Sequence, residues 1–109
     1  PVQAPVVVFV HGWGAMQPQL YGGWIKHLVR KGNIVLFPVY QTSIRTPVKE
    51  MTPSARTGVK AAYAKLAAEG PVRPAKGKLA FVGHSIGGFI ASNLAASAVR
   101  DGLPAAVDF

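Results

Sequence analysis

Short apolar runs alternate along this chain with segments in which apolar and polar residues recur at helical spacing. The runs occupy residues 6–10, 34–37 and about 78–82, and they are rich in β-branched and aromatic residues. Runs of this kind are typical of strands buried on both faces of a parallel sheet. Pro38 predicts that the second strand ends there or lies near a sheet edge. Residues 105–107 are expected to begin a fourth strand.

Three helices are predicted between and after these strands. Residues 24–31 have the spacing of an amphipathic helix, with basic residues between the apolar ones. Residues 52–69 predict a second helix, with Thr52 as its N-cap and Pro53 in its first turn. The alanine-rich segment 86–100 predicts a third, and its largely apolar surface indicates burial against the sheet.

The alternation of strands and helices predicts an α/β fold, with a parallel sheet flanked by helices and joined by right-handed crossovers. Residues 41–51 and 72–77 are expected to be irregular connections. Ligands bind such sheets at the carboxyl ends of the strands. Because residues 11–14 and 83–88 both follow strand ends, we expect these two segments to face one another.

Ser85 lies between Gly83 and Gly87, where the third strand passes into the third helix. A serine at the apex of such a sharp turn adopts a strained backbone conformation, and side chains two residues to either side would collide. The turn lifts the hydroxyl clear of the sheet, beside the free amides and the positive end of the helix dipole. This setting favours an acyl-transfer nucleophile.

Two other interpretations exist for the glycine turns. Ser85 would also suit a helix N-cap, although a cap alone does not need glycine at both flanking positions. A dinucleotide-binding turn fits less well, because Gln17 stands where a third glycine belongs after Gly12 and Gly14. In the second segment, Ser85 occupies the position of the glycine that lets a pyrophosphate approach.

Composition narrows the classes of partner. The 109 residues suffice for one domain and include 12 lysines and arginines against 4 acidic residues, a net charge of +8. The basic residues are dispersed and no nucleic-acid-binding motif accompanies them, so no nucleic-acid partner is expected. Cysteine is absent and the three histidines are widely spaced, so we expect neither a metal site nor a cofactor. No apolar run reaches the roughly 18 residues of a membrane span. Oligomeric state and cell location stay open.

Two motifs in these positions resemble the N-terminal half of the α/β-hydrolase superfamily. They are His11-Gly12-Trp13-Gly14 after one strand and Gly83-His84-Ser85-Ile86-Gly87-Gly88 after another. The run from Trp24 to Val35 is most similar to esterases and lipases related to dienelactone hydrolases. Essentially the whole chain is covered, so the resemblance implies that residues 1–109 form part of an α/β-hydrolase domain.

The resemblance also implies roles for individual residues. Ser85 matches the nucleophile, and the backbone amides of Ile86 and Trp13 match the donors of an oxyanion hole. His84 adjoins the serine, but neighbouring residues at such a turn point apart, so we expect a structural role for it. Residues expected to shape and support the two turns are His11, Gly12, Gly14, Gly83, His84 and Gly87.

A catalytic base is missing from this pattern. The superfamily supplies its triad in the order serine, acid, histidine, and no histidine follows Ser85. The acids that follow are Asp101, at a predicted helix end, and Asp108, which is a candidate triad acid near the last apolar run. We therefore expect residues 1–109 to be a fragment that is inactive on its own.

The predicted function is that of a serine hydrolase of the esterase or lipase type, acting on small-molecule carboxylic esters or lipids through an acyl-enzyme. Aromatic residues near the expected mouth, Trp13, Tyr21 and Tyr40, favour an apolar acyl or aromatic ester, although core packing explains Tyr40 equally well. A non-catalytic binding or scaffold protein with the same architecture is the alternative.

Overall fold

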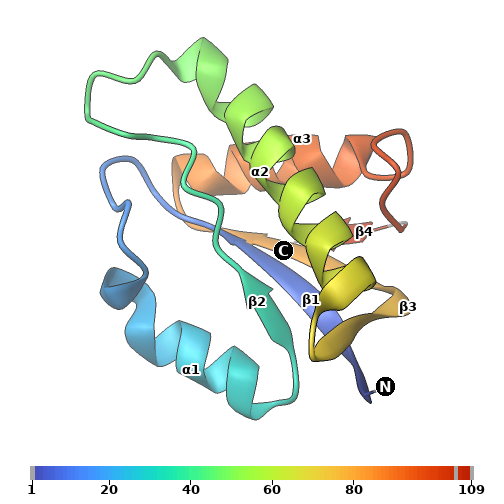
Figure 1. Ribbon diagram of the computed structural model, residues 1–109. Coiled ribbons are helices and arrows are strands. Elements are labelled where there is room, and N and C mark those ends of the chain that lie inside the picture. The colour runs from blue at the N-terminus through green and yellow to red at the C-terminus, as the bar shows by residue number, and fades with distance from the viewer. Residues whose placement is uncertain (1, 105, 109) are drawn as a thin grey trace.

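Four parallel strands form the centre of the molecule. The computed structural model describes residues 2–104 and 106–108, and the side chains of residues 2–104. The strands are β1 (Val2–Val10), β2 (Ile34–Leu36), β3 (Val72–Gly83) and β4 (Ala106–Asp108), in the spatial order β2-β1-β3-β4. The predicted parallel α/β fold is confirmed, and the α1 helix lies on the face of the sheet opposite α2 and α3 (Figure 1).

Strand β1 is covered on both faces, as its continuous apolar run predicts. Val6, Val8 and Val10 belong to the core beneath α2 and α3, and each is almost fully buried. Phe9 points the other way and is equally buried. Burial of such side chains contributes about 1.5–3 kcal/mol each, so this strand anchors both halves of the core.

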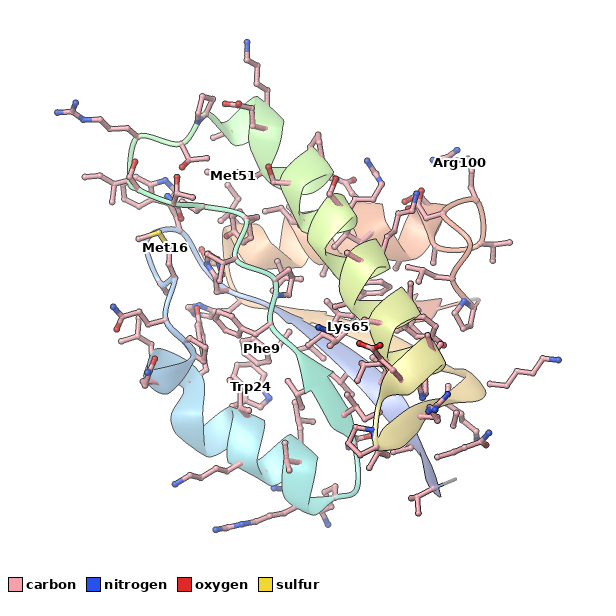
Figure 2. All side chains as sticks on the ribbon, in the orientation of Figure 1. Phe9, Met16, Trp24, Met51, Lys65 and Arg100 are labelled. Carbon is pink, nitrogen blue, oxygen red and sulfur yellow. The ribbon has the colours of Figure 1, made fainter. Side chains whose placement is uncertain are left out.

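Helix α1 (Gly22–Arg30) covers the second face through aromatic contacts. It follows a short 3-10 helix, η1 (Pro18–Tyr21). Figure 2 shows Phe9 above Trp24 of α1. The two rings meet edge-on with 4.8 Å between centroids, and the Phe9 ring also stacks on Phe37 at 6.1 Å. The predicted amphipathic helix is confirmed, but it is only partly covered, since Trp24 stays 46% exposed.

Strand β2 is short and lies at an edge of the sheet. It pairs only with β1 among the described strands, from Val6↔Ile34 to Val8↔Leu36. All three of its residues are half-buried rather than fully buried, as expected of a strand with one neighbour. The edge position indicated by Pro38 is therefore confirmed.

Helix α2 (Val48–Glu69) begins earlier than the sequence predicts, so Thr52 is not its N-cap and Pro53 lies inside it. Pro47 takes an extended conformation before the helix, and its carbonyl accepts the first turn's hydrogen bond from Glu50. Met51, Ala55 and Val59, spaced by four residues, are all buried. Packing of this stripe extends the helix backwards past a proline that local propensity disfavours.

Strand β3 is also longer than predicted, because residues 72–77 are not an irregular connection. Its first part pairs with β1 from Val2↔Val72 to Ala4↔Pro74, and pairing resumes at Val6↔Leu79. Residues 75–78 thus stand opposite the single residue Pro5, and Gly77 has φ +73°. This bulge is an irregularity that apolar patterning does not reveal.

Helix α3 (Ile86–Ser97) is buried on one face only. Ile90, Ala91 and Leu94 pack into the core, so the predicted burial against the sheet is confirmed, whereas Phe89 on another face is 64% exposed. The fourth predicted strand is present as β4, although Ala105 lies outside the described residues. None of the described helices combines the length and apolarity needed to cross a bilayer.

An ion pair joins α2 to the turn after α3. Arg56 Nε donates to Asp101 Oδ2 at 3.1 Å, and the Ser97 hydroxyl donates to the same oxygen at 2.7 Å. The hydrogen bond from Ser97, followed by the charge of Arg56, lowers the pKa of Asp101 below its ordinary 3.8. The ionised carboxylate is therefore the form that the fold favours.

Asp101→Asn is expected to lower the melting temperature at pH 7, because the folded state loses the carboxylate that Arg56 and Ser97 stabilise. A pKa depressed by folding contributes stability above its unfolded value, and the contribution disappears as pH falls through the folded value. The difference between the variant and the wild type should therefore shrink below about pH 4. Thermal unfolding from pH 2 to pH 7 measures this.

Glu69→Gln is the matched control. Its carboxylate contacts Lys65 at 3.9 Å with both side chains largely exposed, and such pairs contribute little. An Asp101→Asn difference that stayed constant across the pH range would contradict the electrostatic explanation.

Candidate functional site

Ser85 lies at the turn between β3 and α3 with backbone angles of φ 58° and ψ −126°. It is the one residue other than glycine with positive φ in the described part of the chain. Such a conformation costs about 1–3 kcal/mol and persists only where the surrounding structure enforces it. The side chain is exposed and makes no capping hydrogen bond, which argues against the helix-cap interpretation.

Close backbone contacts at Gly83 and Gly87 enforce this turn. A Cβ on Gly83 would lie under 3.0 Å from backbone atoms of Gly87 and Gly88. A Cβ on Gly87 would lie equally close to the carbonyls of Val10 and His11. The start of α3 therefore rests directly on backbone, and neither position accommodates a side chain.

The ends of β1 and β3 bring the two glycine-containing segments together, as predicted. Val10 pairs with Gly83, and the amide of His84 donates to the carbonyl of Val10 at 3.1 Å. Chain connections leave β1 and β3 towards opposite faces of the sheet (Figure 1). This is the switch point at which open α/β sheets bind their ligands.

Side chains from the β2–α2 connection hold the beginning of the loop after β1. The Tyr40 hydroxyl donates to the carbonyl of His11 at 2.5 Å, and the two rings stack with 4.1 Å between centroids. Burial, with a smaller contribution from Tyr21, raises the pKa of Tyr40 to about 12, so this hydroxyl remains a donor at neutral pH. Tyr40 is a core residue, and its suggested place at a substrate mouth is wrong.

His11 is fully buried, and burial lowers its pKa despite an opposing hydrogen bond to Gly12. Its Nδ1 lies 2.7 Å from the carbonyl of Gly12, which can only accept, so the neutral ring carries its proton there. His11 is thus a neutral structural group at neutral pH, consistent with its predicted supporting position.

Two further side chains hold amides of the same loop. The amide of Gly12 donates to the Tyr21 hydroxyl at 2.7 Å, and the amide of Gly14 donates to Gln41 Oε1 at 2.7 Å. Gln41 is fully buried, although the sequence indicated only that it begins a polar connection. Its partner is 27 residues away, and no local pattern encodes such a pairing.

The backbone amides of Trp13 and Ile86 are the two predicted oxyanion-hole donors. Among the hydrogen bonds found for residues 2–104, none uses either amide as its donor. Ile86 is the first residue of α3, where backbone amides have no partner within the helix and the dipole favours negative charge. Both residues adjoin the contact between the two loops. Backbone amides without an acceptor can donate hydrogen bonds to an anion.

The family model of the chlorophyllases matches residues 2–107. The chain belongs to the chlorophyllase family. No curated protein matches it.

The chlorophyllase family consists of α/β-hydrolases of the dienelactone-hydrolase-like kind, so the predicted superfamily and branch are confirmed. The match spans both glycine segments and all four strands except the last residue of β4. It also supports a hydrolase of the ester-cleaving kind, with a small-molecule ester as substrate.

The remaining titratable groups of this chlorophyllase-family chain lie apart from Ser85 or serve other contacts. His27 is exposed on α1, and Asp101 is engaged with Arg56 and Ser97. Asp108 pairs through its backbone with Phe81, and its side chain lies outside the described residues. Within residues 2–104, no three His, Asp or Glu side chains gather as a metal ion would require.

Gly87→Ala is expected to destabilise the fold by about 3 kcal/mol, because the added methyl group meets backbone carbonyls that cannot move independently. Gly88→Ala is the matched control in the same turn of α3. Its Cβ would lie 3.8 Å from the nearest atom, and alanine favours the helix by up to about 1 kcal/mol. Urea unfolding compares the two, and equal stabilities would contradict the steric explanation.

Proposed function

We propose that this protein is a serine hydrolase that cleaves carboxylic esters through an acyl-enzyme formed on Ser85. The observation that carries the proposal is the strained, exposed serine at the start of α3, near two amides for which no acceptor is found among residues 2–104. Strained backbone of this kind clusters at reactive sites. Membership of an ester-hydrolase family supports the same reaction.

The chemistry follows from these groups. The Ser85 oxygen forms a bond to the ester carbonyl carbon while its proton passes to a base, and the carbonyl oxygen becomes an oxyanion. The amides of Trp13 and Ile86 would donate to that oxygen, and one such donor typically contributes about 3 kcal/mol. The carbon–oxygen bond to the alcohol then breaks, the alcohol takes the proton, and water releases the acid by the reverse sequence.

The base has to come from residues other than the three histidines of this sequence. His11 is buried and stacked on Tyr40, and His27 lies on α1. The ring of His84 is held through Nδ1 by the Tyr21 hydroxyl at 3.1 Å. We infer that a histidine joins the site from elsewhere in the full-length protein and that residues 1–109 alone turn over no ester. The acid that orients this histidine comes from the same part of the protein, or is Asp108.

The substrate is proposed to be an ester with an apolar acyl or alcohol part. Trp13 exposes 54% of its surface next to the free amide of its own backbone, and an exposed indole favours apolar contact. A substrate panel of short and long acyl esters, including chlorophyll, for which the family is named, compares these possibilities.

Ser85→Ala in the full-length protein is expected to abolish both ester hydrolysis and labelling by a fluorophosphonate probe, because the only proposed nucleophile is removed. Ser54→Ala, at an exposed position on α2, is the control and should label normally. Gel fluorescence and mass spectrometry of the labelled peptide measure this. Labelling that persists in Ser85→Ala would overturn the proposal, and a wild type that never labels would favour the binding-protein alternative.

A further inference from the structure

Three consecutive amides in the loop after β1 have different partners. Those of Gly12 and Gly14 donate to side chains, each at 2.7 Å, whereas that of Trp13 between them has no acceptor among residues 2–104. The peptide group between Gly12 and Trp13 is planar, and its carbonyl is also held, because Gly12 O accepts from the Ala15 amide at 3.1 Å and lies 2.7 Å from His11 Nδ1. The free amide is therefore held in one direction by its neighbours.

Tyr21 provides the first of these side chains. Its ring packs against Phe9 with 4.7 Å between centroids, and its hydroxyl accepts from Gly12. Because the hydroxyl accepts there, its own proton is free to donate to His84 Nδ1, 3.1 Å away. One phenol thus connects the loop after β1 to the residue preceding Ser85.

Gln41 provides the second, and it does so at a cost in stability. Its Oε1 accepts from Gly14, but its Nε2 is buried and finds no partner among the side chains and backbone of residues 2–104. A buried donor without an acceptor destabilises the folded state, and an apolar residue of the same shape would avoid this cost. Gly14 adopts φ +77°, a conformation that favours glycine, and Gln41 Oε1 is the acceptor found for its amide. The presence of a buried glutamine at position 41 is therefore better explained by its hydrogen bond to the Gly14 amide than by a contribution to core stability.

We propose that Tyr21 and Gln41 are positioning residues that fix the Trp13 amide as an oxyanion donor and align it with Ser85 through His84. This inference rests on the proposed function. Neither side chain touches the reacting atoms in this scheme, since each acts through a backbone amide next to Trp13. Preorganised donors are effective because they need no reorganisation when charge develops.

The test uses Tyr21→Phe and Gln41→Met in the full-length protein. Each variant keeps the size of the side chain and removes the acceptor from one glycine amide. We expect kcat to fall about 10- to 100-fold with KM within about twofold, less than the 10²–10³ lost when a donor is removed outright. Affinity for a boronic acid, whose tetrahedral serine adduct carries the oxyanion, should fall by a similar factor.

Tyr63→Phe is the matched control, because this half-buried tyrosine packs against the core from α2, away from both loops. Amide hydrogen exchange gives a readout that is independent of turnover. Gly12 should lose protection in Tyr21→Phe and Gly14 in Gln41→Met, with the helix amides unchanged. This pattern separates a positioned loop from general destabilisation.

The outcomes separate the two proposals. Activity that survives in Ser85→Ala would overturn the proposed function. If Ser85→Ala is inactive but Tyr21→Phe and Gln41→Met match Tyr63→Phe in kcat and boronate affinity, the nucleophile stands and the positioning role is wrong. A rise in KM with unchanged kcat would also contradict the positioning role, because it indicates a contact made equally in the ground state.

Discussion

The contact between the start of α3 and the end of β1 is the constraint on which the rest of the structure depends. Backbone meets backbone there, because a Cβ at Gly87 would lie against the carbonyls of Val10 and His11. The approach forces Ser85 into a positive φ and brings the β1 loop beside it. Burial of β1 on both faces holds this strand rigidly enough to support the strained turn.

Sequence patterning predicted those parts of the fold that depend on apolar periodicity. The run of residues 6–10 and the spacing of residues 24–31 each correspond to an element of the structure. It failed where packing overrides local preference. At Pro53 the buried stripe that begins with Met51 outweighs a poor helix former, and opposite Pro5 a bulge lengthens β3 beyond its apolar run.

The candidate site divides in the same way. Gly83, Ser85 and Gly87 were predictable because the spacing of this turn motif is local, extending over five residues, although the backbone that excludes a side chain at Gly87 belongs to Val10 and His11. Tyr21 and Gln41 were not, since their contacts with the loop join residues 9 and 27 positions apart. A side chain that accepts from a distant backbone amide leaves no periodic signal, and the polar character of Gln41 is equally compatible with an exposed loop.

Stability and function oppose each other in the loop after β1. Both His11 Nε2 and Gln41 Nε2 are buried without partners in the part of the chain that the structure describes, so this loop rests on polar side chains that an apolar core would not contain. The same side chains fix the backbone between residues 11 and 14 before any ligand arrives. In the proposed mechanism the loop after β1 is therefore ordered during folding. The binding of an ester does not have to supply the free energy of ordering it. Because buried side chains hold this loop in one conformation, the Trp13 amide can stay without a protein acceptor. A mobile glycine loop would instead rearrange until that amide found an acceptor.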